Sequence, residues 1–339
     1  MINLLDKCIE NIRWFFGDDG VISNEIITST PISTKRGMFR PSTFSEYIGQ
    51  EKIKEIITRY MLGIKQRNKT FPHILISGPP GFGKTTLAQV IAKELSVPFK
   101  STIGSSISNL KDLFSGILNV KDSILFVDEI HALDRNIVEQ VYTLMEDFKI
   151  GEIDITPFTI IGATTELGEI LKDRRPFYDR FKIILELENY QTEDLETIAK
   201  QYKEKEFTNE NLNKSSYSIL ARNCRNTPRA VLRLLEATIY FEGDVKKVLS
   251  SFNIIKNGYT YKDLSILKYL LENIKGVGLQ GLCSYLNIPT ETYLYEIEPY
   301  LLTNGLLVRT ARGRKITNNG IKTIKELYEE LNPPYKSNV

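Results

Sequence analysis

Continuous apolar runs alternate with helical patterns over the first half of the chain. Residues 73–77 (HILIS), 123–128 (SILFVD) and 158–163 (FTIIGA) lack the every-second-residue alternation of a half-buried strand. Strands that are buried on both faces have this composition, and they occur in parallel sheets covered by helices. Residues 85–95 (TTLAQVIAKEL) then repeat apolar positions at helical spacing. We therefore predict an α/β core, with a parallel sheet covered by helices, over residues 39–190.

The pattern becomes purely helical after this core. Residues 191–252 contain three amphipathic stretches, TEDLETIAKQYKEKE, NKSSYSILARNC and TPRAVLRLLEATIYF, without a strand-like run between them. They predict a short all-helical domain.

Residues 253–330 change pattern again. We predict one helix at 261–273 and, after a GVGL break, two short helices at 279–287 and 290–303. The following alternating run, GLLVRTARGRKIT, is typical of a β-hairpin. Three helices and a hairpin indicate a winged helix-turn-helix, which is a DNA-binding arrangement.

The two ends of the chain differ from these domains. Residues 1–38 combine a helical pattern with a polar linker, so they predict either a partner-binding helix or a helix packed on its own domain. Both alternatives stay open. Residues 331–339 (LNPPYKSNV) are expected to form a loose tail.

Composition and charge narrow the class of protein. The chain has 339 residues and a net charge of +2, so any surface for nucleic acid must be local. Its three cysteines are far apart, which favours reduced thiols and a cytoplasmic location. With only two histidines, a conventional zinc site is not expected. No apolar run approaches the ~20 residues that span a bilayer, and no signal peptide is evident.

A phosphate-binding loop follows the first apolar run. Residues 78–85 (GPPGFGKT) fit the P-loop pattern, in which glycines let backbone N–H groups surround the phosphates. Lys84 would then reach the β- and γ-phosphates, and Thr85 would place a hydroxyl on Mg²⁺. The pattern lies between a strand and a helix, as this chemistry requires. A glycine-rich turn without a ligand is the alternative, and this context disfavours it.

Two acidic residues end the second apolar run. Asp128 should lie near Thr85 and the metal, and Glu129 is the candidate base that polarises the attacking water. The alternative is that the two carboxylates only cap the next helix. Residues 128–131, which end in His131, read DEIH. This segment is similar to one helicase signature, but the other motifs of those helicases are not visible. We interpret His131 as structural or solvated.

Eight segments, taken in order, resemble the RuvB family of AAA+ ATPases, which drive Holliday-junction branch migration. They are FRPSTFSEYIGQEKIKE, GPPGFGKTTLA, LFVDEIHALDR, MEDF, FTIIGATT, YDRF, NTPRAVLRLL and GLLVRTARGR. The likeness covers about residues 39–320, and the ordered set is specific although a P-loop alone is common. The resemblance implies an AAA+ core at 39–190, a helical lid at 191–252 and a winged helix at 253–330. It also implies ATP and Mg²⁺ as cofactors and a homo-oligomer, a hexameric ring.

The resemblance also implies roles for individual residues. The expected nucleotide, phosphate and metal contacts are Phe39, Arg40, Gly81, Gly83, Lys84, Thr85, Thr86, Glu146, Asp147, Phe148 and Tyr190. Thr165 matches a sensor of the γ-phosphate, and Arg229 matches a sensor arginine that acts within its own subunit. Arg180 matches the arginine finger, which reaches the ATP of a neighbouring subunit. Either arginine could instead be an ordinary surface residue, which the complete set of motifs disfavours.

This sequence departs from the family in three places. Only KIGEIDITP separates Phe148 from Phe158, where the family has a longer hairpin that docks its partner RuvA. Two strands with a useful apolar tip hardly fit there, so a RuvA partnership is doubtful. Tyr178 stands two places before the finger, where the family has an arginine, and the altered stretch supplies Arg174 and Arg175. The N-terminal 38 residues are longer than the family needs.

The hairpin of the winged helix carries the candidate DNA contacts. Arg309, Arg312 and Arg314, with Lys315, give four positive charges within seven residues. We predict that the three arginines contact the DNA backbone without reading sequence. A solvated hairpin that is basic by chance is the alternative.

Three functions fit these features. The leading hypothesis is an ATP-driven DNA motor that performs branch migration or duplex translocation on Holliday-type junctions in recombination and repair. The alternative is an AAA+ loader or switch that places a partner protein on DNA without sustained translocation. A nucleotide-binding module without turnover is disfavoured by Glu129 and Arg180 together.

Overall fold

The computed structural model describes residues 39–67, 69–114, 120–150 and 153–331. They belong to two compact units, which divide between Asn189 and Tyr190. The predictions for residues 1–38 and for the tail after Leu331 lie outside the described residues. Within the described part of the chain, no helix has both the length and the apolarity needed to cross a bilayer.

A five-stranded parallel sheet forms the centre of the first unit, with strand order β2-β3-β6-β1-β7. The strands are β1 (Ile74–Ser77), β2 (Phe99–Ile103), β3 (Ile124–Asp128), β6 (Thr159–Thr164) and β7 (Ile183–Glu186). The three predicted apolar runs are the three interior strands, and these are buried almost throughout. The predicted parallel sheet is therefore confirmed. The edge strands β2 and β7 were not predicted. β2 mixes apolar and polar residues, whereas β7 contains the apolar run 183–185 (IIL) and alternates buried and exposed positions.

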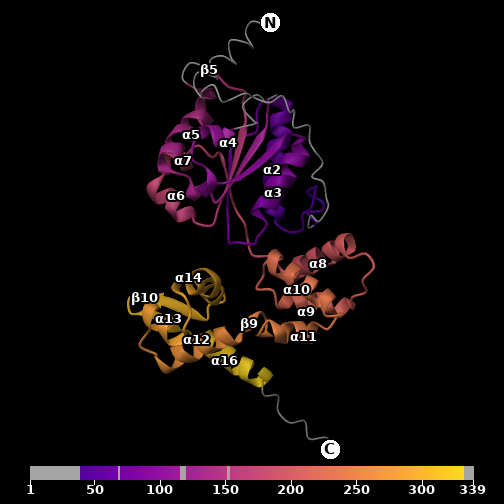
Figure 1. Cartoon of the computed structure of the whole chain (residues 1–339), viewed down its shortest axis with the longest axis vertical. Helices are drawn as coiled ribbons and strands as arrows, with labels where there is room; N and C mark the ends of the chain where they lie inside the picture. Colours follow the sequence, from indigo (N-terminus) through magenta and orange to yellow (C-terminus); the bar gives the residue numbers. More distant parts are fainter. Residues whose placement is uncertain (1–38, 68, 115–119, 151–152, 332–339) are drawn as a thin grey trace, which may run out of the picture. The chain divides into compact units, whose positions relative to one another are not determined.

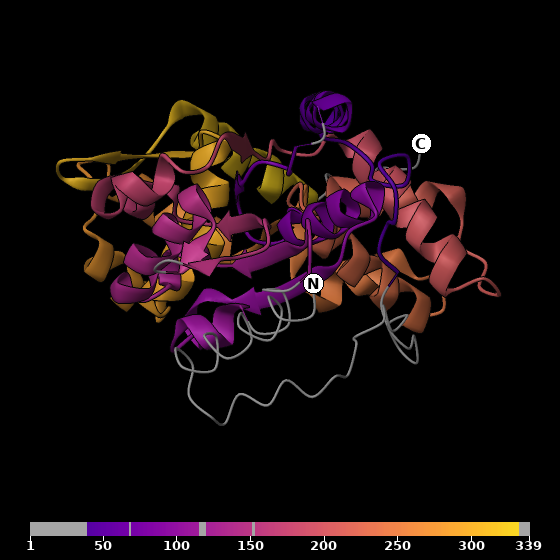
Figure 2. The ribbon, with the colours of Figure 1, turned by 90° about the horizontal axis from the view of Figure 1, so that it is seen from above.

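Helices cover both faces of this sheet. Helices α2 (Glu51–Arg67) and α3 (Lys84–Leu95) lie on one face. The other face carries α4 (Leu110–Phe114), α5 (Arg135–Asp147), α6 (Leu167–Asp173) and α7 (Arg175–Tyr178), as Figure 1 shows. Leu75, Leu125 and Ile160 of the sheet belong to the same buried cluster as residues of these four helices. Figure 2 shows the same sheet from above.

The strand order brings three carboxyl ends together. β6 lies between β3 and β1, with Ser77 level with Thr164 and Val127 level with Gly162. Because the strands are parallel, the residues after all three emerge at the same edge of the sheet. The P-loop, the acidic pair and Thr165 therefore meet there, although they are far apart in the sequence.

The segment after α5 forms a minimal hairpin. Strands β4 (Lys149–Ile150) and β5 (Ile153–Asp154) pair in an antiparallel ladder of two residues each. Two strands are thus present, each of only two residues, and whether they carry an apolar tip stays a prediction. Pairing needs only two residues on each side, since a turn of two residues can close such a hairpin.

The second unit begins with the predicted helices. They are α8 (Thr192–Glu206), α9 (Lys214–Arg222), α10 (Pro228–Tyr240) and α11 (Val245–Ser251), of which only α11 was not predicted. Short strands β8 (Ile254–Lys256) and β9 (Tyr259–Thr260) follow as an antiparallel pair.

The three predicted helical segments and the predicted hairpin follow, and a further helix, α16 (Asn318–Leu331), which was not predicted, ends the described part of the second unit. The predicted segments are α12 (Tyr261–Glu272), α13 (Leu279–Leu286), the stretch Thr290–Thr303 and the strands β10 (Leu307–Thr310) and β11 (Gly313–Ile316). The stretch 290–303 is not one uniform helix, because a π-helical turn, Tyr293–Ile297, separates α14 (Thr290–Thr292) from α15 (Glu298–Thr303). Pro299 has no N–H for an α-helical bond, which accounts for the irregular turn before it.

His73 connects the sheet to the end of α5. Its Nδ1 accepts a hydrogen bond from the Ile160 amide at 2.9 Å, so its Nε2 carries the proton and donates to the Met145 carbonyl at 3.1 Å. Burial lowers the pKa of His73 to about 4, and the bond to Met145 opposes this only in part. The neutral ring therefore fixes α5 against β6.

This coupling predicts an acid-dependent loss of stability. An unfolded histidine protonates near pH 6.5, whereas folded His73 stays neutral to about pH 4. The stability that it contributes is present above pH 6.5 and is lost as the pH falls toward 4, by roughly 3 kcal/mol in total at about 1.4 kcal/mol per pKa unit. Urea unfolding of wild type and His73→Gln at pH 7.5 and 4.5 measures this. An equal loss of stability in both proteins would show that His73 does not carry the effect.

Candidate functional site

The P-loop begins where β1 ends and closes on α3. Gly81 and Gly83 have φ angles of 81° and 91°, in the left-handed region that favours glycine. Lys84 is the first residue of α3 and is only 7% exposed. Its ammonium donates to the carbonyls of Gly78 at 2.7 Å and Pro79 at 3.2 Å, so it lies across the mouth of the loop. This is the geometry that a phosphate-binding lysine needs.

Thr85 and Asp128 come from different elements and lie in contact. The Thr85 hydroxyl donates to Asp128 Oδ2 at 3.2 Å, beside the positive end of α3. A hydroxyl and a carboxylate are hard oxygen donors of the kind that Mg²⁺ takes at nucleotide sites. The pair therefore fits the metal predicted from the sequence.

Glu129 has an unusual backbone conformation. Its φ is 47°, in the left-handed region, and its amide donates to Asp128 Oδ1 at 3.1 Å. Its carboxylate accepts a hydrogen bond of 3.0 Å from the Thr165 hydroxyl, at the end of β6. The candidate base and the candidate sensor are therefore neighbours. An outlying φ of this kind is often kept at functional positions.

His131 lies next to this pair. Its Nδ1 is 3.0 Å from the Thr164 hydroxyl and 3.4 Å from Glu129 Oε2, and the side chain is half-buried. The same Thr164 hydroxyl accepts a hydrogen bond from the Glu166 amide at 2.9 Å. These contacts favour the structural interpretation of His131, because they tie the turn after β3 to the end of β6.

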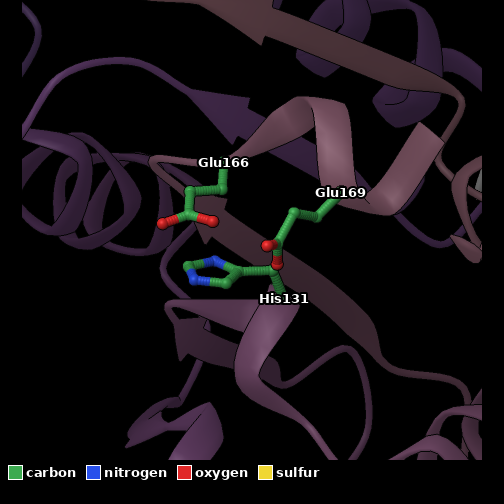
Figure 3. A group of neighbouring side chains, drawn as sticks. All are labelled: His131, Glu166 and Glu169. Carbon is green, nitrogen blue, oxygen red and sulfur yellow. The ribbon is translucent and has the colours of Figure 1, made fainter. Parts of the chain in front are cut away.

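Glu166 and Glu169 face the same imidazole, as Figure 3 shows. The ligand atoms of His131 and the two glutamates lie within 4.8 Å of one another. Burial, a hydrogen bond with Glu169 and the charge of Glu169 raise the pKa of Glu166. Exposed carboxylates often cluster without binding an ion, so the grouping alone assigns no metal. Sequence reasoning did not single out these two glutamates.

Gly104 was also missed, although it shapes the site. A Cβ on this residue would lie 2.5 Å from the Glu129 carbonyl oxygen, closer than real contacts allow. The backbone after β2 therefore approaches the backbone of Glu129 only because residue 104 is glycine. The one available signal was a glycine directly after the FKSTI stretch.

The other residues predicted at the nucleotide have varied surroundings. Arg40 donates to Gln89 on α3 at 3.2 Å, which holds the segment after Phe39 near that helix. Thr86 is half-buried in the first turn of α3. The Phe148 ring packs on Phe158, with centroids 5.5 Å apart, so it belongs partly to the core. Glu146 and Asp147 are exposed at the end of α5.

Arg180 lies close to this same end of α5. Its guanidinium forms an ion pair of 2.6 Å with Glu146. Arg175 lies over the Tyr178 ring, 5.4 Å from its centroid, and pairs with Asp179 at 3.2 Å. Residues near position 178 that differ from the family pattern therefore contact one another. The Arg180 side chain stays partly on the surface, 31% exposed.

The last two nucleotide residues belong to the second unit. Tyr190 is buried just before α8, and Arg229 is exposed in the first turn of α10. Their roles at the nucleotide stay predictions.

The structure separates the three wing arginines. Glu298 is fully buried and accepts from Arg314 at 2.7 Å and from Arg309 at 2.7 Å. Burial alone would raise the pKa of Glu298, but the hydrogen bonds from Arg314 and Arg309 outweigh it and leave the pKa lowered. The Arg314 side chain is 14% exposed, whereas that of Arg309 is 57% exposed and Arg312 lies exposed in the turn. The geometry therefore gives Arg314 a structural contact that the sequence did not indicate.

The geometry predicts that Lys84 serves ATP binding, whereas Glu129 serves ATP hydrolysis. Lys84→Ala removes the charge that meets the phosphates, so ATP affinity should fall at least tenfold. Glu129→Gln keeps the shape of the pocket but removes the anionic base, so it should bind ATP normally and hydrolyse it at least 100-fold more slowly. Nucleotide binding and turnover are measured for both variants. Normal turnover by Glu129→Gln would assign the base elsewhere.

Comparisons with known proteins identify the family of this chain. Residues 39–187 match the family described as "Holliday junction DNA helicase RuvB P-loop domain", and residues 256–325 match "RuvB C-terminal winged helix domain". A protein of Mycoplasmopsis pulmonis, named Holliday junction branch migration complex subunit RuvB, is 35% identical over 86% of this chain and 99% of its own length. The protein of that name from Phytoplasma mali is 36% identical over 89% of this chain and 97% of its own length.

A solved structure gives the same result. The Thermotoga maritima RuvB Holliday junction branch migration motor has a TM-score of 0.73 and 35% identity, over 85% of this chain and 99% of that chain. The similarity thus extends through both units and is not limited to the P-loop. This chain belongs to the RuvB family of AAA+ ATPases.

Proposed function

We propose that this protein is an ATP-driven DNA motor that moves Holliday-type junctions during recombination and repair. The observation that carries the proposal is the meeting of Lys84, Thr85, Asp128 and Glu129 at one edge of the sheet, in a chain that also has a winged helix. The names of its relatives supply the substrate class, a Holliday junction.

Hydrolysis is assigned to the residues around the P-loop. Lys84 and the glycine-rich backbone hold the phosphates, and Thr85 and Asp128 supply ligands for Mg²⁺, which when bound offsets the negative charge of the phosphates. Glu129 orients and polarises the water. Thr165, which donates to Glu129, connects the state of the γ-phosphate to that base.

The site is completed by a second copy of the chain. Arg180 is on the surface, 31% exposed, which supports a role toward a neighbouring subunit. A homo-oligomer, and by family resemblance a hexameric ring, would place Arg180 of one subunit at the ATP of the next. Phe39, Arg40, Thr86 and Asp147 are proposed nucleotide contacts, with Tyr190 at the hinge before the lid and Arg229 within the lid at residues 191–252. For Glu146, its ion pair with Arg180 replaces the nucleotide contact predicted from the sequence.

The wing at residues 307–316 is the proposed DNA contact. Arg312 and Lys315 are exposed, and Arg309 is exposed over much of its length. Contacts to phosphates suit a motor, because a motor gains nothing from reading sequence. Arg314 supports this surface indirectly, through its bond to Glu298. We place the protein in the cytoplasm, consistent with the free cysteines Cys224 and Cys283.

The proposal predicts ATP turnover that depends on DNA. Turnover is measured without DNA, with linear duplex and with a four-way junction, each without added protein, and junction movement is followed by strand separation on gels. We expect stimulation by DNA and ATP-dependent movement that Glu129→Gln abolishes. Stimulation that requires a protein partner, without movement of the junction, would favour the loader function instead.

The wing predicts a salt-dependent effect on DNA binding. Each phosphate contact contributes ~0.9 to the slope of log affinity against log salt concentration. Arg312→Ala with Lys315→Ala should therefore flatten the slope by roughly two units and weaken binding to all duplex sequences alike. Arg314→Ala is the contrasting variant, since it leaves buried Glu298 with only Arg309 and should cost about 3 kcal/mol of stability. An unchanged slope in the double variant would place the DNA contact elsewhere.

The β4–β5 hairpin is short, so we predict that a RuvA-type partner does not bind to it. Strands of two residues offer little apolar surface for docking. In a direct pull-down, we expect that a cognate RuvA shows no hairpin-dependent binding to the wild-type protein. Tight binding that is lost when Lys149 and Asp154 are substituted would contradict the prediction.

A further inference from the structure

The ion pair between Arg180 and Glu146 lies beside an aromatic ring. Arg180 Nη2 lies 2.6 Å from Glu146 Oε2, and its Cζ lies 5.8 Å from the centre of the Tyr142 ring. Tyr142 and Glu146 are one turn apart on α5, so they present one face to the guanidinium. An aromatic ring and a carboxylate therefore both contact the same arginine.

The backbone beneath Arg180 is fixed. Its amide donates to the Phe177 carbonyl at 3.2 Å. The buried rings of Phe177 and Phe181 pack edge to face, with centroids 5.1 Å apart. The direction in which Arg180 points therefore depends on its own side-chain torsions, and through these on what its guanidinium contacts.

Burial limits the part of the guanidinium that can reach outward. Arg180 Nε is buried and has no hydrogen-bond partner among the described residues. The side chain as a whole is 31% exposed, so the terminal nitrogens are the accessible edge. Glu146 holds one of these two nitrogens.

We propose that Glu146 is a positioning residue that orients Arg180 for the ATP of a neighbouring subunit. The inference rests on the proposed function, in which Arg180 is the finger. An ion pair with one partner 54% exposed biases an equilibrium by no more than about five-fold. That bias is too weak to withhold Arg180 from a triphosphate, but it is enough to favour one orientation of a long, flexible side chain.

The test separates orientation from direct contact with the nucleotide. Glu146→Gln should lower kcat two- to five-fold and leave KM unchanged, because the finger acts in the transition state. Glu139→Gln is the matched control, since Glu139 is an exposed glutamate on the same helix that pairs with Arg135 at 3.6 Å; it should leave both constants unchanged. Thermal melting and ATP binding check that each variant is folded.

A second experiment starts from the Arg180→Ala variant, at an enzyme concentration high enough to measure its residual ATP turnover. Adding Glu146→Gln to Arg180→Ala should cause no further loss, because the residue on which Glu146 acts is absent. A further loss there, a raised KM with unchanged kcat, or a kcat above wild type would each overturn the inference. If Arg180→Ala alone kept wild-type turnover, the proposed shared site would fail and the inference would fall with it.

Discussion

Thr85 and Asp128 are joined by a hydrogen bond of 3.2 Å across two elements that are 43 residues apart in the sequence. That contact exists because β6 separates β1 from β3 in a parallel sheet, so the ends of all three strands meet. Glu129 and Thr165 become neighbours for the same reason. The positions of Thr85, Asp128, Glu129 and Thr165 thus depend on strand order, which burial of the interior strands stabilises.

A second constraint organises the wing. Glu298 is fully buried at the start of α15, and a buried carboxylate must be paired to remain charged. Arg314 and Arg309 pair with it from the two strands of the hairpin. Backbone bonds between Arg314 and Val277 extend the ladder to the break before α13, where Gly313 leaves room for the Val277 carbonyl. The ion pairs with Glu298 thus determine which positive charges of the wing remain exposed.

The sequence predicted some features better than others, for physical reasons. The interior strands and the P-loop have local signals, namely continuous apolar runs and a fixed spacing of glycines around Lys84. Strand β2 mixes apolar and polar residues, and the close approach of Gly104 to Glu129 depends on tertiary packing, so neither has a clear local signal. The role of Arg314 was hidden because Glu298, its partner, lies sixteen residues earlier and is buried only in the folded chain. The hairpin after α5 was expected to be too short for two strands with a useful apolar tip, and its strands have two residues each.

The proposed motor function requires a nucleotide site shared between two copies of the chain. The direct measurement is ATP turnover in mixtures of Arg180→Ala and Lys84→Ala at varied ratios. Each variant alone should be nearly inactive, because an arginine finger contributes ~10³–10⁵ in rate where it has been isolated. Mixed assemblies should recover activity, with the first variant supplying an intact P-loop and the second supplying the finger. No recovery in mixtures shown to co-assemble would contradict the account.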